Sequence, residues 1–125
     1  MAVYAEFCEK GLSLQIDNVN SMDENVIRSI KDVAKTALPE NSRLLLYGSR
    51  ARGDSHAGSD WDLLILLDKP RIEADDYDNV AFPFTMLGWD INEMISPHLY
   101  TKRQWDSWAY SPFYKNVERD KIILV

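Results

Sequence analysis

The sequence has one cysteine, Cys8, and two histidines among its 125 residues. A single cysteine cannot form an internal disulfide, so we expect a protein of a reducing compartment, the cytoplasm. His56 and His98 lie far apart in the sequence and have no cysteine pair beside them, so zinc-finger-like spacing is absent. These absences exclude a disulfide scaffold and a zinc module of that type.

Long apolar runs and an excess of positive charge are also missing. No apolar run approaches the roughly 20 residues of a membrane-spanning helix, and residues 1–11 lack the basic and apolar regions of a secretory signal. The net charge is −6, whereas domains that grip long nucleic acid are usually basic. We therefore expect neither a membrane span nor a duplex nucleic-acid partner. An acidic protein can still bind a nucleotide when divalent cations lie between its carboxylates and the phosphates.

The length and the 46% hydrophobic content predict a single domain over residues 1–125 with one core. Residues 1–20 are hard to assign and fit either a packed helix or a short strand. Apolar periodicity, caps and prolines predict a helix over 21–38, strands at 43–48, 60–68, 87–95 and within 121–125, and one or two helices over 101–120, with Thr101 and Ser111 as caps. This order indicates an α/β fold, a small mixed sheet with flanking helices.

Glycine is scarce, yet three of the five glycines fall in one segment, YGSRARGDSHAGSDWDLLIL, residues 47–66. A strand that ends in Gly-Ser and turns into a short helix exposes backbone N–H groups that attract a phosphate. Gly48 lets the backbone approach a ligand, and Ser49 adds a hydroxyl donor. Arg50 and Arg52 can fork onto phosphate oxygens, although Arg52 could equally hold the loop by pairing with a carboxylate.

Two aspartates, Asp60 and Asp62, follow at the start of the second strand. Positions i and i+2 of a strand face the same way, so their carboxylates project side by side. Two carboxylates held that close repel each other, and a bound cation would relieve the repulsion. Mg²⁺ binds carboxylate oxygens together with the phosphate oxygens of a substrate. The segment therefore predicts a phosphate cradle beside a metal platform at one edge of the sheet.

This arrangement resembles the nucleotidyltransferase superfamily of the DNA polymerase β type. The superfamily pattern is Gly-Ser, a spacer, Asp-x-Asp, and a further carboxylate on a later strand; here Gly48 and Ser49 precede Asp60-Trp61-Asp62. The longer match is similar to the minimal nucleotidyltransferases of the MntA-like antitoxin group and covers residues 22–125. The resemblance implies the polymerase β-type fold and two divalent ions, Mg²⁺ or Mn²⁺, held by the aspartates.

The third carboxylate of that pattern stands between apolar residues. Asp90 in GWDIN matches, and Glu93 is the alternative within the same expected strand, facing the other way. We favour Asp90. By the resemblance, Asp60 and Asp62 hold both metal ions, and Asp90 completes one metal site and helps to activate the attacking hydroxyl.

The resemblance implies a nucleotidyltransferase that transfers a nucleoside monophosphate, AMP from ATP, to a hydroxyl and releases pyrophosphate. Similar minimal proteins pair with helical toxins of the HEPN kind and place AMP on a toxin tyrosine, so a partner protein is the first choice of acceptor. A small hydroxylated molecule such as an aminoglycoside is the second. A binding module that covers a partner without catalysis is the alternative of another class.

Other conspicuous residues have structural interpretations. We expect His56 to be solvated and residues 73–78, EADDYD, to form a solvated acidic loop. Trp105 and Trp108 could stack on a nucleobase, but large aromatics at helical spacing usually belong to a core. We expect Trp61 and Trp89 to pack beneath the site.

Overall fold

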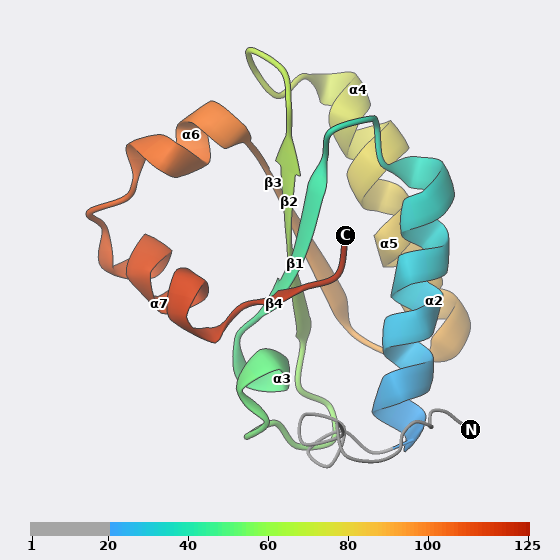
Figure 1. Cartoon of the computed structure of the whole chain (residues 1–125). Helices are drawn as coiled ribbons and strands as arrows, with labels where there is room; N and C mark the ends of the chain where they lie inside the picture. Colours follow the sequence, from blue (N-terminus) through green and yellow to red (C-terminus); the bar gives the residue numbers. More distant parts are fainter. Residues whose placement is uncertain (1–20) are drawn as a thin grey trace.

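The structure is a computed structural model that describes residues 21–125, and the expectation for residues 1–20 lies outside them. Figure 1 shows a sheet with helices on both faces. The elements in chain order are α2 (Ser21–Ala37), β1 (Arg43–Tyr47), α3 (Ser49–Arg52), β2 (Trp61–Leu67), α4 (Ala74–Asp76), the π-helical turn η1 (Tyr77–Ala81), α5 (Phe82–Ile91), β3 (Ile95–Thr101), α6 (Lys102–Ser107), α7 (Pro112–Asp120) and β4 (Ile122–Ile123). Within the described part, no helix is long and apolar enough to cross a membrane.

The sheet has the strand order β3-β2-β1-β4. Strand β1 is antiparallel to both β2 and β4, and β2 is parallel to β3. The parallel pair needs a crossover, and the segment from α4 to α5 provides it. The sheet is therefore mixed, and the expected α/β fold with flanking helices is confirmed.

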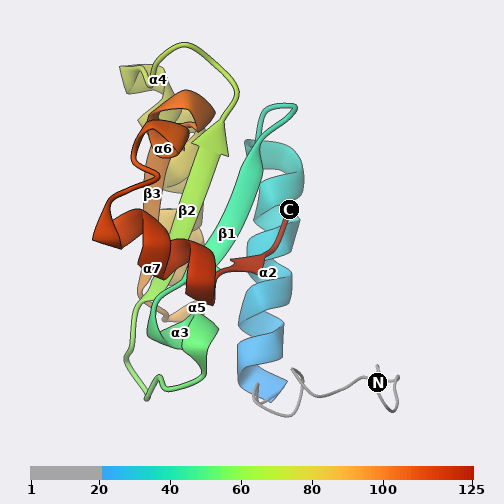
Figure 2. The same ribbon diagram turned by 60° about the vertical axis from the view of Figure 1, so that its left-hand side comes forward.

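Strand β2 divides its side chains between two cores. Its odd-numbered residues, from Trp61 to Leu67, are buried against the side of the sheet that α2 and α5 cover. Leu64 and Leu66 face the other side and pack with Trp105 of α6 and Val117 of α7. Figures 1 and 2 show α2 and α5 on one face of the sheet and α6 and α7 on the other. Asp62, an even-numbered residue, therefore lies on the α6–α7 side.

The expected helix of residues 21–38 and the first two strands are confirmed. Helix α2 buries Val26, Ile30 and Ala34, which recur every four residues along one face. The caps of the last two helices are also confirmed: the side chain of Thr101 accepts a hydrogen bond from the Gln104 N–H, and that of Ser111 from the Tyr114 N–H.

The expected strand over residues 87–95 is wrong. Residues 82–91 form α5, with Pro83 in its first turn, where the missing N–H costs nothing. Asn92, with φ of 60°, ends the helix in the left-handed conformation. The strand is β3, which begins at Ile95 and contains Pro97. As β3 is an edge strand, the sheet tolerates this proline.

Three further expectations are wrong. Trp89 is 68% exposed on α5 instead of packed beneath the site, and Trp108 is 38% exposed, although Trp61 and Trp105 are buried as expected. Residues 73–78 are exposed as expected except for Asp76, but they contain α4 and part of η1 instead of a loop. Asp76 is buried there, and Lys69 Nζ donates hydrogen bonds to its two oxygens at 3.1 and 2.8 Å. Burial alone would raise the pKa of Asp76, but the hydrogen bonds from Lys69 and from the backbone N–H of Glu73, with the charge of Lys69, outweigh it and hold the pKa below its ordinary value.

Candidate active site

A glycine-serine turn joins β1 to the short helix α3. Gly48 caps the helix with φ of 78° and ψ of −159°, a conformation that only glycine adopts readily. Its carbonyl accepts hydrogen bonds from the Ala51 and Arg52 N–H groups, at 3.0 and 3.1 Å. The predicted strand-to-helix turn is therefore present, with Ser49 as the first residue of the helix.

Gly48 lies directly against one of the two aspartates. Residues 47 and 62 are paired across β1 and β2, which brings the start of β2 beside the turn. A Cβ atom on Gly48 would lie 2.6 Å from Oδ2 of Asp62, closer than a non-bonded carbon and oxygen approach each other. The glycine is therefore required both by its backbone conformation and by the carboxylate that occupies the space of a side chain.

Asp60 and Asp62, the carboxylate pair, lie at the beginning of β2. Asp60 is exposed and Asp62 is half-buried. Burial raises the pKa of the Asp62 carboxyl above its usual value, the nearby charge of Asp60 raises it further, and His98 opposes the rise. The hydroxyl of Ser96 on β3 donates a hydrogen bond to Asp60 Oδ2 at 3.4 Å. Two close carboxylates that repel each other are a fitting oxygen-donor set for Mg²⁺.

The third carboxylate that we expected is not part of this group. Asp90 is exposed in the last turn of α5, on the helix that covers the opposite face of the sheet from Asp62. Glu93 instead accepts a hydrogen bond from the indole N–H of Trp61 at 3.0 Å. Within residues 21–125 there is no group of three or more histidine, cysteine, aspartate or glutamate side chains placed to hold a metal ion. The argument for Asp90 depended on a strand that the structure does not contain.

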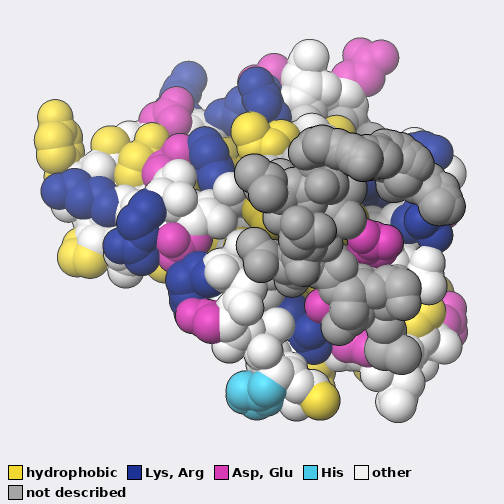
Figure 3. Space-filling model, turned by 60° about the horizontal axis from the view of Figure 1, so that its bottom comes forward, with side chains coloured by type: hydrophobic (Ala, Val, Ile, Leu, Met, Phe, Trp, Pro, Cys, Tyr) yellow, Lys and Arg dark blue, Asp and Glu magenta, His cyan; other side chains and the backbone are white. Residues whose placement is uncertain are grey.

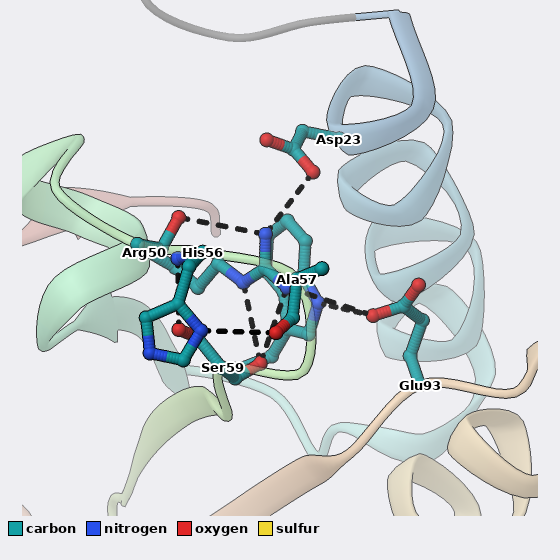
Figure 4. Close-up of polar contacts among 8 residues, drawn as sticks. Asp23, Arg50, His56, Ala57, Ser59 and Glu93 are labelled. Atoms are coloured by element: carbon teal, nitrogen blue, oxygen red, sulfur yellow. Dashed lines mark hydrogen bonds and ion pairs between the residues drawn. The ribbon is translucent and has the colours of Figure 1, made fainter.

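Arg50 is the centre of a polar cluster that sequence reasoning missed (Figure 4). Its guanidinium donates to the carbonyl of Ser59 at 3.3 and 3.2 Å and pairs with Asp23 of α2 at 3.3 Å and Glu93 at 3.8 Å. It also lies over the Trp61 ring, 4.5 Å from the centroid. Only 8% of the Arg50 side chain is exposed. Its donors therefore hold the loop before β2 against α2 and the turn before β3.

Arg52 has a different environment from Arg50. Its side chain is 43% exposed and pairs with Asp54 at 3.2 Å and with Asp120 of α7 at 3.6 Å. Hydrogen bonding to Asp54 raises the pKa of Arg52, so it is always a cation. Of the two arginines, Arg52 is the one that keeps an exposed guanidinium near the Gly-Ser turn. Figure 3 views this end of the molecule and shows basic and acidic side chains interspersed on it.

An aromatic group borders the carboxylate pair. The Tyr47 ring lies 6.2 Å from that of His98 and 5.8 Å from that of Phe113, measured between centroids. Burial, with the charge of Asp62 and then Tyr100, raises the pKa of Tyr47 to about 12. The phenol is therefore a neutral hydrogen-bond donor beside Asp62. The predicted solvent position of His56 agrees with its exposure in the loop.

A mixed sheet with helices on both faces, a Gly-Ser turn after one strand and paired aspartates on the next define the polymerase β-type nucleotidyltransferase class. The model of the nucleotidyltransferase domain family matches residues 27–124. The chain belongs to that family.

One solved structure that resembles this chain is described as a crystal structure of a toxin-antitoxin with AMP-PNP. The TM-score is 0.57 and the sequence identity 17%, with 79% of this chain and 72% of that chain covered. At this identity the likeness shows the shared fold. No curated protein matches the chain.

Proposed function

We propose that this chain is a divalent-metal-dependent nucleotidyltransferase that uses ATP to place AMP on a hydroxyl of a partner protein. The observation that carries the proposal is the contact between Gly48 and the Asp62 carboxylate. Through this contact the Gly-Ser turn, which is suited to bind a phosphate, directly adjoins the carboxylate pair, which is suited to bind a divalent cation. A nucleoside triphosphate with Mg²⁺ is the ligand that needs both at once.

The residues have distinct roles in this proposal. Asp60 and Asp62 would hold Mg²⁺, which supplies charge neutralisation for the phosphates when bound. The Ser49 hydroxyl and the N–H groups of the turn bind phosphate oxygens, and Arg52 adds a positive charge. Arg50 positions the loop that leads into the carboxylate pair. The acceptor oxygen attacks the α-phosphorus, the bond to the β-phosphate oxygen breaks, pyrophosphate leaves, and the acceptor proton passes to solvent.

A partner protein is supported by the surface of the chain. Large apolar side chains are exposed on α5: Phe82 is 43%, Met86 45% and Trp89 68% exposed. They recur at positions i, i+4 and i+7 and so lie along one side of the helix. Exposed apolar patches of this kind mark protein interaction sites. The structural neighbour is described as a toxin-antitoxin, and the resemblance to the MntA-like group points to a helical toxin whose tyrosine accepts AMP.

The test uses the protein encoded beside this chain as the acceptor. We expect intact-mass spectrometry to find AMP units on that partner after incubation with ATP, Mg²⁺ and the wild-type chain, with peptide mapping to tyrosine. The Asp60→Asn, Asp62→Asn double variant is the control and should add none. If the partner stays unmodified while a small hydroxylated compound is adenylylated, the chain is a small-molecule nucleotidyltransferase and the proposed acceptor is wrong. If the partner binds stably and AMP is transferred to neither acceptor, the chain is a binding module and not an enzyme of this kind.

A further inference from the structure

Strand β3 passes close to the carboxylate pair but brings no carboxylate to it. It runs parallel to β2, with Ser96 paired to Asp62 and His98 paired to Leu64. Residues paired across two strands share a face, so Ser96 and His98 are the side chains of β3 beside the carboxylate pair. The 3.4 Å hydrogen bond from Ser96 to Asp60 confirms that placement.

Neither side chain can replace an anionic magnesium ligand. Serine is neutral, and imidazole is a nitrogen donor, whereas Mg²⁺ prefers carboxylate, phosphate and water oxygens. The two acidic residues before β3 lie elsewhere. Asp90 is exposed on α5, and Glu93 is engaged with Trp61 and Arg50. The described donor set therefore ends at two carboxylates.

Two carboxylates are a poor match for two divalent ions. Ions that act on the same phosphate lie about 3.5–4 Å apart. The repulsion between two dications is four times that between two unit charges at the same distance. The carboxylate pair and the nucleotide's phosphates can supply the oxygen ligands of one ion. A second ion beside it needs a further carboxylate ligand to complete its coordination and to hold it against the repulsion of the first. In this chain the position from which β3 could supply that carboxylate holds Ser96.

We infer that the carboxylate pair binds a single divalent ion together with the nucleotide, and that Ser96 is the position that denies the chain a second ion. The inference depends on the proposed nucleotide site and specifies its metal content. It also departs from the two ions that the resemblance implies, since that number presumes a third carboxylate beside the pair.

The experiment counts ions by electron paramagnetic resonance, with Mn²⁺ titrated into the full chain and saturating non-hydrolysable ATP analogue. The Asp60→Asn, Asp62→Asn double variant gives the baseline for Mn²⁺ bound to analogue alone. We expect one protein-bound Mn²⁺ above this baseline, with no spectrum of an exchange-coupled pair. Ser96→Asp should bind two ions and show the coupled spectrum. Ser107→Asp adds the same charge on exposed α6 and should still bind one.

The outcomes separate the inference from the proposed function. No Mn²⁺ above the baseline in the wild-type chain would overturn the proposed nucleotide site itself. Two ions in the wild-type chain would overturn the inference and leave the proposed function standing. A folded Ser96→Asp chain that still binds one ion would refute the role of Ser96. The wild-type count needs no substitution, so the inference can be refuted even if Ser96→Asp does not fold.

Discussion

Replacing Gly48 by alanine tests the contact that joins the turn to the carboxylate pair. The backbone of Gly48, at φ of 78° and ψ of −159°, lies in a region almost restricted to glycine, and a β-carbon there costs on the order of 1–3 kcal/mol. The new Cβ would also meet Asp62 Oδ2 at 2.6 Å. Turning the Asp62 side chain away from its rotamer adds about 0.5–1.5 kcal/mol. We therefore expect Gly48→Ala to lower the free energy of unfolding by about 1.5–4.5 kcal/mol.

A double-mutant cycle in urea separates the two contributions. In the Asp62→Ala background the clash is gone and only the backbone cost remains, so Gly48→Ala should be less damaging there. In the Asp62→Asn background the side chain has the same shape, so the full cost should persist. Gly58→Ala is the control for conformation alone, because Gly58 has φ of 89° and no atom lies within 4 Å of its added Cβ.

Two results would refute this reasoning. If Gly48→Ala were as stable as the wild-type chain, the backbone argument would be wrong. If its cost were the same with and without the Asp62 side chain, the contact would be irrelevant to stability. The Gly48→Ala variant should also bind Mn²⁺ more weakly in the presence of an ATP analogue, because the Asp62 carboxylate has to move away from its place beside the Asp60 carboxylate.

Three other predictions concern single side chains. Asp62→Asn should abolish Mn²⁺-dependent nucleotide binding and leave the urea midpoint equal or higher, because a half-buried charge beside Asp60 is removed; a large loss of stability would contradict this. Ser49→Ala should weaken binding of the ATP analogue by about 5- to 150-fold in calorimetry, corresponding to the loss of about 1–3 kcal/mol for a charge-assisted hydrogen bond; unchanged affinity would mean that Ser49 only shapes the turn. Asp76 has a pKa below its unfolded value despite its burial, so it stabilises the fold above the ordinary value of 3.8 and loses that contribution as the pH falls through the folded pKa. Lys69→Met should therefore lower stability at pH 7 and reduce its further loss on acidification, and urea midpoints that fall in parallel for both chains would disprove the role of the pair.

The first half of the fold could be predicted because local patterns there agree with the tertiary structure. Helix α2 has one apolar face, and the run from Leu63 to Leu67 is apolar throughout because both faces of β2 are covered. Gly48 and the carboxylate pair were predictable for a related reason. A backbone conformation that only glycine adopts requires a glycine at that position, and two aspartates two residues apart are directly visible in the sequence.

The second half could not be predicted from local pattern. Strand β3 contains Pro97, which disfavours a strand and is tolerated because β3 lies at the edge of the sheet, and the polar residues Ser96 and His98 interrupt its apolar pattern. Helix α5 has apolar residues on its exposed side as well as its buried side, so it lacks helical periodicity. The expected strand was therefore placed one element too early, and Asp90 with it.

The contacts of Arg50 could not be predicted from the sequence for a different reason. Its partners come from α2, from the loop before β2 and from the turn before β3, so they are distant in sequence and meet only in the folded chain. An arginine directly after a Gly-Ser turn favours phosphate binding when it is read alone. The local sequence contains no sign that its charge is already engaged.

The division of β2 between two faces also limits how chains of this architecture can change in length. Trp61 is buried in the core under α2 and α5, and the next residue, Asp62, belongs to the carboxylate pair on the other face. One residue inserted or deleted within β2 would exchange the two faces for part of the strand, burying a charge or exposing an apolar side chain. The preceding segment, residues 53–60, is largely exposed and can absorb such changes. Natural insertions and deletions should therefore collect between Gly53 and Asp60, while β2 keeps a constant length.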